Sequence, residues 1–262
     1  MQSDNDVAVM KTIIKAFETL EVLTQKPEWE LGELCERLPL PKTTVHRIIV
    51  TLEKLGYVSQ EKRRGTYSLT SKLFKMGSSA INHTGLVDMA RQDCHHLLDE
   101  VEETVNLCIP NETEMLVVDI QVSPHPLRQA THIGTGFEMI RSASGRAYLA
   151  FLPDSEKKEL LSRIRSQGEF SDEEWKALLA ELDEVRQTGV GYDNEEIFTG
   201  VKCLAAPVFN HQSNVIASIS ISAPIIRLND EKIKTAVFAV RETAARISSK
   251  LGAPNTPFMN QK

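Results

Sequence analysis

Two prolines, Pro39 and Pro41, separate two short segments whose apolar residues recur at helical spacing. Pro39 cannot continue a helix, whereas the fixed φ of Pro41 suits the first turn of a new one. The spacing predicts a short helix that Pro39 ends and a second helix from Pro41 to Leu55, with Gly56 as its stop signal. The two apolar stripes are Leu31, Leu34, Cys35 and Leu38, and Val45, Ile48, Ile49, Leu52 and Leu55. This part of the chain is therefore predicted to form a helix–turn–helix.

The flanking segments extend this motif into a small domain. An amphipathic helix is predicted over about residues 7–25, and Lys26-Pro27 ends it. Two β-rich pieces, 57–60 and 66–69, enclose a basic segment, 61–65, that is typical of a hairpin tip. The apolar stripe of the first helix comprises Val9, Ile13, Ala16, Phe17, Leu20 and Leu23. Three helices followed by a hairpin predict a winged helix–turn–helix.

Charge is distributed unevenly along the chain. Residues 41–75 contain eight Lys or Arg and two Glu, a net charge of +6, in a chain whose formal total is −6. The remainder therefore carries −12. A short basic segment on an acidic protein attracts phosphate locally, while the rest of the protein avoids nonspecific contact with nucleic acid. Double-stranded DNA is the partner that this distribution favours.

The rest of the chain has the pattern of a second domain. A helical pattern over 71–82 predicts a linker helix, and Thr84-Gly85 is the predicted domain boundary. The expected divisions are a winged domain over 1–70, a linker over 71–84, a second domain over 85–255 and a tail over 256–262. In the second domain, helices are expected over 86–103, from Ser142, and over 154–166, 171–188 and 229–251, with strands over 104–109, 114–122, 127–132, 201–208 and 215–222. The predicted class is α+β, with a winged helix–turn–helix joined by a linker helix to an α/β domain whose sheet is mainly antiparallel.

Three segments carry more specific motifs. One is Leu38-Pro-Leu-Pro-Lys-Thr-Thr-Val-His-Arg47 with Leu52-Glu-Lys-Leu-Gly-Tyr-Val58, and another runs from Gly191 to Phe209 and continues in Ile219-Ser-Ile-Ser-Ala-Pro224. The third is Ser144-Gly-Arg-Ala-Tyr-Leu-Ala150. These segments resemble the helix–turn–helix, the effector-domain signature and a Gly-Lys-Ala segment of the IclR family of transcription regulators, although Arg146 stands where Lys is usual. The resemblance implies a DNA-binding regulator that senses a small molecule, with dimers pairing into tetramers. A two-fold operator by itself requires at least a homodimer.

The outward face of the helix predicted from Pro41 suits the major groove of DNA, which is about 12 Å wide and accepts one helix. Thr43, His46 and Arg47 have groups that reach base edges, and Arg47 has the geometry for a bidentate contact with guanine. Val50 suits a thymine methyl group. The other candidates, which flank this face or are expected to meet phosphate, are Lys42, Thr44, Lys54, Lys62, Arg63 and Arg64. A solvated basic face or a protein-binding winged helix is the alternative, but polar face, turn, hairpin and charge together favour DNA.

Serines alternate with apolar residues in the strand predicted over 215–222, so Ser218, Ser220 and Ser222 share one face. Cys203 alternates likewise in the neighbouring strand, which predicts either the floor of a mildly polar pocket or a half-exposed sheet whose serines face water. The segment from Ser142 precedes a helix, whose first N–H groups can receive a carboxylate. The resemblance implies effector contacts at Ala143, Ser144, Asp193, Cys203, Ser220 and Ser222, to which the start of the helix adds Gly145. Asp193 is expected to accept from a ligand hydroxyl, and the predicted effector is a small hydroxy or keto acid.

An enzyme acting on a small acid, with an auxiliary winged-helix domain, is the alternative function, and Asp193, Cys203 or Ser220 would then be catalytic. The chain has no Ser/His/Asp arrangement and no clear metal-ligand spacing, so we expect no catalytic residue, cofactor or metal. Its four cysteines include no CxxC pair, which favours reduced thiols. No apolar run reaches membrane-spanning length and the first residues are polar, so a cytoplasmic protein without membrane contact is expected.

Overall fold

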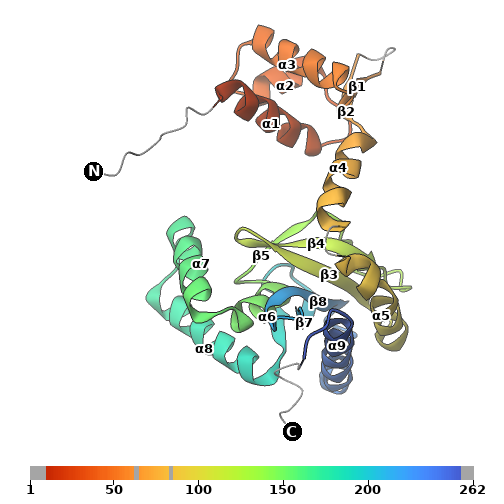
Figure 1. Cartoon of the computed structure of the whole chain (residues 1–262), viewed down its shortest axis with the longest axis vertical. Helices are drawn as coiled ribbons and strands as arrows, with labels where there is room; N and C mark the ends of the chain where they lie inside the picture. The colour runs from red at the N-terminus through yellow and green to blue at the C-terminus, as the bar shows by residue number, and fades with distance from the viewer. Residues whose placement is uncertain (1–9, 62–64, 83–84, 255–262) are drawn as a thin grey trace. The chain divides into compact units, whose positions relative to one another are not determined.

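The computed structural model describes residues 10–61, 65–82 and 85–254 of the 262-residue chain. The chain divides into two compact units, residues 1–83 and 84–262. Each unit has its own secondary structure and its own buried residues (Figure 1). In the described part of the chain, no helix is both long enough and apolar enough to span a membrane.

The first unit is a winged helix–turn–helix. Its elements are α1 (Lys11–Thr24), α2 (Leu31–Arg37), α3 (Lys42–Lys54), β1 (Val58–Gln60), β2 (Tyr67–Leu69) and α4 (Ser71–Asn82). Strands β1 and β2 pair antiparallel, and Trp29 adds a bridge to Tyr67. Buried side chains from α1, α2, α3 and the hairpin form one core, whose members include Leu23, Leu34, Ile49, Val58 and Tyr67. The predicted fold of this unit is confirmed.

The turn between α2 and α3 follows from its residues. Leu38, which follows the last residue of α2, has an extended backbone, and Pro41 precedes the first residue of α3. Glu30 and Glu33 form a capping box at the start of α2, which satisfies backbone N–H groups that the helix leaves free. Gly56 follows α3 with φ +78°, a left-handed conformation that glycine adopts without steric cost. The chain can therefore turn between α2 and α3 and again after α3.

Some residues of the predicted apolar stripes do not reach the core. Ile13 and Phe17 of α1 are 50% and 61% exposed, and Leu55 after α3 is 52% exposed. The core face of α1 instead carries Thr19, whose hydroxyl donates to the Lys15 carbonyl and so needs no partner outside the helix. The prediction of an amphipathic helix was right, but its buried face is rotated from the predicted stripe. Val9 lies outside the described residues.

The second unit is built on a six-stranded sheet in which all neighbouring strands are antiparallel. The strand order is β5-β4-β3-β8-β7-β6. The strands are β3 (Thr104–Asn111), β4 (Glu114–Gln121), β5 (Gly136–Glu138), β6 (Gly191–Asn194), β7 (Val201–Phe209) and β8 (Val215–Pro224). The mainly antiparallel sheet predicted from the sequence is confirmed.

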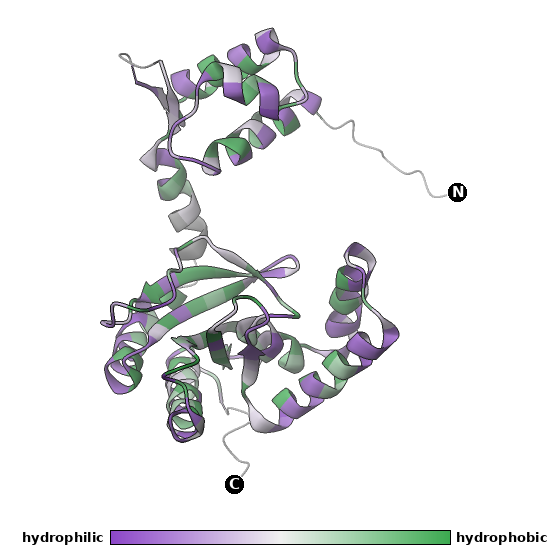
Figure 2. Cartoon of the chain, turned by 180° about the vertical axis from the view of Figure 1, so that it is seen from behind, coloured by the Kyte–Doolittle hydropathy of each residue, from purple (hydrophilic) through white to green (hydrophobic). Residues whose placement is uncertain are grey.

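Helices cover both faces of this sheet. The helices are α5 (Leu86–Val101), α6 (Ala143–Phe151), α7 (Asp154–Gln167), α8 (Asp172–Thr188) and α9 (Asp230–Lys250). Helices α5 and α9 pack together over the strands, α6 contacts β6, β7 and β8, and α8 contacts α6 (Figure 1). The strands are mostly hydrophobic, whereas α7 and α8 carry many hydrophilic residues (Figure 2). This is the pattern of a buried sheet with partly solvated outer helices.

One predicted strand is absent from the structure, and two short strands were not predicted. Residues 127–132, predicted as a strand, are irregular, because the segment contains no strand pairing and follows two prolines, Pro124 and Pro126. Two short strands, β5 and β6, were not predicted, since neither has a long run of β-branched or alternating residues. Both lie at the edges of the sheet, where pairing on one side suffices.

Two glycines allow α6 to lie close to its neighbours. A Cβ atom on Gly145 would lie 2.1 Å from the carbonyl oxygen and 2.2 Å from the Cα of Met139. A Cβ atom on Gly191 of β6 would lie 2.5 Å from the Ala143 carbonyl oxygen. All three distances are far below van der Waals contact and involve backbone atoms that cannot move independently. No larger residue fits at either position without displacing the helix.

We predict that Gly145→Ala lowers the free energy of unfolding of the second unit by about 1–3 kcal/mol or more, the usual cost of overpacking. The chain has two tryptophans, Trp29 in the first unit and Trp175 in the second, so a Trp29→Phe background lets Trp175 fluorescence report the second unit alone. Gly32→Ala is the matched control, because a Cβ atom there meets nothing within 4 Å in α2. Because Gly32 lies in the first unit, that change is expected to leave the Trp175 transition of the second unit unchanged. An unchanged urea midpoint for Gly145→Ala would contradict the close packing of α6.

Candidate functional site

The outward face of α3 is polar and accessible. Lys42, Thr43, His46, Arg47 and Lys54 are exposed, and Thr44 and Val50 are half-buried. The opposite face, with Val45, Ile48, Ile49 and Leu52, is buried in the core. The structure thus brings the seven α3 candidates together on one helix, whereas the hairpin candidates Lys62, Arg63 and Arg64 lie outside the described residues.

The basic residues of this region differ in what they contact. Within the described residues, no carboxylate pairs with Lys42, Arg47 or Lys54. Lys72, which also contributes to the basic segment, donates from Nζ to the Leu55 carbonyl at 2.6 Å and lies over the Tyr57 ring. Lys72 therefore supports the fold, whereas Lys42, Arg47 and Lys54 are available to a polyanion.

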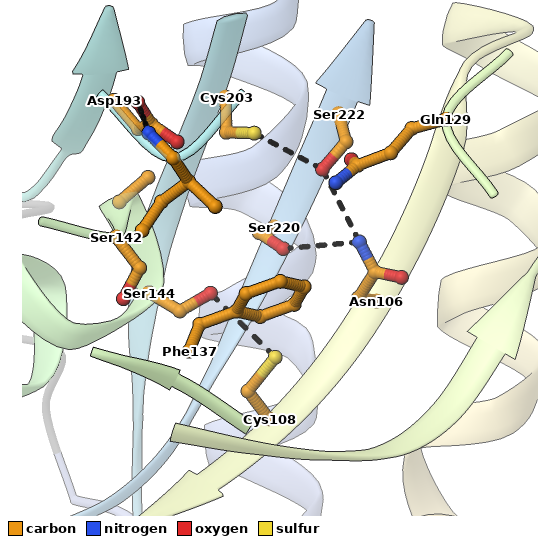
Figure 3. Close-up of a pocket in the computed structure, with 12 residues that line it drawn as sticks. Asn106, Cys108, Gln129, Phe137, Ser142, Ser144, Asp193, Cys203, Ser220 and Ser222 are labelled. Atoms are coloured by element: carbon orange, nitrogen blue, oxygen red, sulfur yellow. Dashed lines mark hydrogen bonds between the residues drawn. The ribbon is translucent and has the colours of Figure 1, made fainter. Parts of the chain in front are cut away.

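The second unit contains a small cavity between its sheet, the start of α6 and the loop that follows β6. Its volume is about 20 Å³, which is room for about one water molecule. Figure 3 shows its polar side chains converging from the sheet and from α6. The lining residues are Asn106, Cys108, Gln129, Phe137, Ser142, Ala143, Ser144, Asp193, Ile197, Cys203, Ser220 and Ser222.

The register of the sheet assembles the floor of the cavity. Asp193 pairs with Cys203 across β6 and β7, and Cys203 pairs with Ser222 across β7 and β8. Ser220, two residues before Ser222, pairs with Asn106 of β3. Side chains at paired positions lie on the same face, so five polar groups from four strands share one surface. The alternative in which these serines face water is wrong, because Ser220 and Ser222 are each only 4% exposed.

Hydrogen bonds connect these floor residues. The Asn106 side-chain amide donates to the hydroxyls of Ser222 at 3.3 Å and Ser220 at 3.5 Å, and the Cys203 sulfur lies 3.2 Å from the Ser222 oxygen (Figure 3). The carbonyl oxygens of the Asn106 and Gln129 side chains are buried without a hydrogen-bond donor among the described residues. Buried acceptors of this kind are costly unless a water or ligand supplies a donor.

The N-terminus of α6 forms one wall. The Ser142 hydroxyl accepts from the Gly145 N–H at 3.1 Å, and the Ser144 hydroxyl donates to the Cys108 sulfur at 3.6 Å. The N–H groups of Ala143 and Ser144 have no acceptor within the described part of the chain. Two free N–H groups and the positive end of the helix favour an anion here. Gly145 does not line the cavity, since it packs on Met139.

Asp193 is held by the loop that follows it. Its Oδ1 atom accepts from the backbone N–H groups of Glu196 at 2.8 Å and Ile197 at 3.4 Å. Burial raises the pKa of the Asp193 carboxyl, although the two N–H donors act in the opposite direction. No Lys, Arg or His is among the described lining residues, so Asp193 is the charged group of the cavity.

The two thiols of the cavity are not activated. Burial raises the pKa of Cys203 to about 12 and that of Cys108 to about 11. A thiol with such a pKa stays protonated near neutral pH and is a poor nucleophile. The cavity is therefore suited to binding a small polar molecule through hydroxyl, thiol, amide and N–H groups.

The sequence predicted half of this lining. It placed Ala143, Ser144, Asp193, Cys203, Ser220 and Ser222 together, and the structure brings all six to the cavity. It missed Asn106, Cys108, Gln129, Phe137, Ser142 and Ile197 as lining residues. Asn106 carried a usable signal, because an amide in the middle of an otherwise apolar strand needs a buried partner.

A winged helix–turn–helix with an unpaired basic helix face, in one chain with an α/β domain that contains a lined cavity, defines a DNA-binding transcription regulator. The chain belongs to the IclR family. The family model of the IclR helix-turn-helix domain matches residues 12–62, and the model described as bacterial transcriptional regulator IclR C-terminal matches residues 78–249.

Known transcription regulators are similar to this chain over most of its length. The HTH-type transcriptional regulator KdgR of Escherichia coli is 33% identical over 251 residues, which cover 95% of each chain. The transcriptional repressor IclR of Escherichia coli is 30% identical over 207 residues, 78% of this chain and 76% of that protein. The crystal structure of Thermotoga maritima IclR superposes with a TM-score of 0.75 at 28% identity, covering 93% of this chain and 100% of that one. The chain is a regulator, so the enzyme alternative for Asp193, Cys203 and Ser220 is wrong.

We predict that iodoacetamide alkylates Cys203 very slowly at pH 8, because a pKa of about 12 in place of 9.0 leaves about a thousandfold less thiolate. The rate is expected to rise about tenfold per pH unit over the range in which the protein stays folded, since the thiolate fraction grows tenfold per pH unit below the pKa. Mass spectrometry of the alkylated peptide measures this rate, with free N-acetylcysteine as the reference thiol. Alkylation of Cys203 as fast as the reference at pH 8 would show that the thiol is activated.

Proposed function

We propose that the second domain binds a small organic acid in the cavity and that occupancy changes how the first domain binds its operator. The observation that supports this most directly is the pair of free N–H groups at the start of α6, beside hydroxyls that converge on the same cavity. The proposed effector contacts are Ala143, Ser144, Asp193, Cys203, Ser220 and Ser222. Gly145 is proposed to contribute through its packing rather than by contact.

The carboxylate of such an acid suits the start of α6. The N–H groups of Ala143 and Ser144 are the available donors, and the helix dipole adds a favourable field. Asp193 repels a second anion, so the carboxylate belongs at the helix and not beside this residue. The cavity volume is about 20 Å³ in this structure, so binding of an acid with a few carbon atoms requires the lining side chains to move apart.

Neutral polar groups of the ligand suit the rest of the cavity. Asp193 accepts hydrogen bonds in this structure and would accept one from a ligand hydroxyl. The unpaired side-chain oxygens of Asn106 and Gln129 likewise require donors. A hydroxy acid or the corresponding keto acid is therefore the proposed effector class.

The first domain is proposed to read DNA through α3. Thr43, His46 and Arg47 would contact base edges, and Val50 a thymine methyl group, while Lys42, Thr44 and Lys54 would contact or flank phosphates. The hairpin cations Lys62, Arg63 and Arg64 are proposed to add phosphate or minor-groove contacts. We also propose that the protein works in the cytoplasm as a homodimer or a dimer-of-dimers tetramer, because a two-fold operator presents two half-sites.

An effector alters operator binding only if it binds differently to the arrangements that do and do not fit the operator. The proposal therefore requires a coupling free energy between the cavity and α3. It does not require that the acid touches the DNA-binding domain. The sign of the coupling decides whether the acid releases DNA or retains it.

We predict that Arg47→Ala weakens specific operator binding by about 1–3 kcal/mol, the usual value of one bidentate base contact. Binding of the variant to random duplex DNA should change much less, because base reading contributes little there. Fluorescence anisotropy at fixed salt, with an operator obtained by selection from random sequences, measures both affinities. Lys54→Ala is the comparison, since loss of a phosphate contact weakens both duplexes about equally. Equal losses for Arg47→Ala on both duplexes would contradict the base-reading role.

We predict that Asp193→Asn weakens binding of lactate or glycerate more than binding of pyruvate. The carboxylate accepts a hydrogen bond from the ligand hydroxyl, whereas a keto group has no hydrogen to donate. Isothermal titration calorimetry with matched 2-hydroxy and 2-keto acids measures the difference, and operator anisotropy at saturating acid measures the coupling. A protein that binds only cations or large aromatic compounds, or whose operator affinity is unchanged by a bound acid, would contradict the proposed function.

A further inference from the structure

Arg146, in the second turn of α6, is a buried cation that lies behind the cavity. It is 5% exposed, and its Nη1 atom donates to the Tyr192 carbonyl and to Glu196 Oε1, both at 2.6 Å. Its Nη2 atom donates to Glu196 Oε2 at 2.7 Å, which completes a bidentate pair. Glu181 of α8 adds a second carboxylate, 3.3 Å from Nη1. Arginine alone has the fork geometry for such a pair.

Glu196 belongs to the loop between β6 and β7, which forms part of the cavity wall. Its backbone N–H donates to Asp193, and the next residue, Ile197, lines the cavity. The loop has further internal support, because the Gly200 N–H donates to Glu195 Oε2 at 2.7 Å. These bonds keep the loop folded on itself, whereas the bond from Arg146 to Glu196 ties it to α6.

We propose that Arg146 is a positioning residue for the effector cavity. Through Glu196 it fixes the loop at the place where Asp193 and Ile197 face the start of α6. The two walls that would hold opposite ends of the acid are thus joined by one ion pair that the ligand never touches. This inference rests on the proposed function for its role in binding, but the tie itself is a property of the free protein.

The charges around Arg146 explain why its replacement should change the loop between β6 and β7. Glu196, Glu181 and Asp193 place three carboxylates near a single guanidinium. Without the cation, Glu196, whose side chain is 37% exposed, has no ion-pair partner beside Glu181 and Asp193, and repulsion from these two carboxylates turns it toward solvent. The loop then lacks its ion-pair connection to α6, and we expect the hydrogen bond from the Glu196 N–H to Asp193 to open more often.

Glu181 provides a matched control within the same cluster. It contacts the same Nη1 atom but belongs to α8, and although its carboxylate is near that of Glu196, no described hydrogen bond or ion pair joins it to the loop. Loss of its charge removes an ion pair of Arg146 and leaves the bidentate pair with Glu196 intact. A purely structural role for Arg146 predicts similar effects of Glu181→Gln and Glu196→Gln, whereas the positioning role predicts different ones.

The experiment compares the full-length chain with Arg146→Met, Arg146→Lys, Glu196→Gln and Glu181→Gln. Amide hydrogen exchange of the ligand-free proteins is followed for residues 193–200, and calorimetry with lactate and pyruvate gives the affinities. We expect Arg146→Met to raise exchange at the Glu196 and Ile197 amides and to weaken acid binding at least about tenfold. Glu196→Gln should reproduce part of both effects, and Arg146→Lys should restore part of both, because Lys reaches one oxygen without the fork. Glu181→Gln should leave both within about twofold of the parent chain.

The outcomes distinguish failure of the positioning role of Arg146 from failure of the proposed effector class. Exchange that rises no more in 193–200 than elsewhere, or that rises equally in Glu181→Gln, overturns the positioning role whether or not any acid binds. Localised exchange with unchanged acid affinity also overturns it, because the loop would then move without consequence for the cavity. If neither acid binds the parent chain, the choice of effector class fails, and the exchange data still decide whether Arg146 holds the loop.

Discussion

The second domain depends on how closely the start of α6 approaches the sheet. Three alanines, Ala143, Ala147 and Ala205, form the contact, and two glycines remove the Cβ atoms that would otherwise collide with backbone. This contact brings the free N–H groups of α6 against the polar residues of β3, β7 and β8. A wider separation would admit water and leave the same groups solvated. The small side chains of these alanines and glycines thus allow the close approach that forms the cavity, and the polar residues supply its hydrogen-bonding groups.

The N-terminal fold could be predicted because its signals are local. Pro39, Pro41 and Gly56 mark the helix ends. The apolar stripe of α3 identifies its buried face, because the opposite face of the helix is polar. Phe17 shows the limit of this reasoning, since a large apolar residue at helical spacing still ended up exposed. Periodicity identifies an amphipathic helix, but which of two adjacent apolar stripes is buried depends on tertiary packing.

The cavity residues that were predicted came from two sources, alternation along a strand and resemblance to a family. Ser220 and Ser222 follow from the period of two, and the positions of Asp193 and Ala143 came from family resemblance. Asn106 and Gln129 could not be found in the same way. Asn106 reaches the cavity through the pairing of β3 with β8, strands more than 100 residues apart in sequence. Gln129 comes from an irregular segment for which no periodic rule applies.

Charged residues in the two domains serve opposite purposes. In the second domain, Arg146 pairs with Glu196, Arg227 forms a bidentate pair with Glu103, and Lys250 pairs with Asp93, so these cations are neutralised within the fold. On α3 the cations remain available.

Two hydrogen bonds join the start of α4 to the end of α3. Lys72 Nζ donates to the Leu55 carbonyl, and the Thr70 hydroxyl, just before α4, donates to the Gly56 carbonyl at 2.6 Å. The first turn of α4 is therefore held against the end of α3, and a displacement of that turn is transmitted to α3.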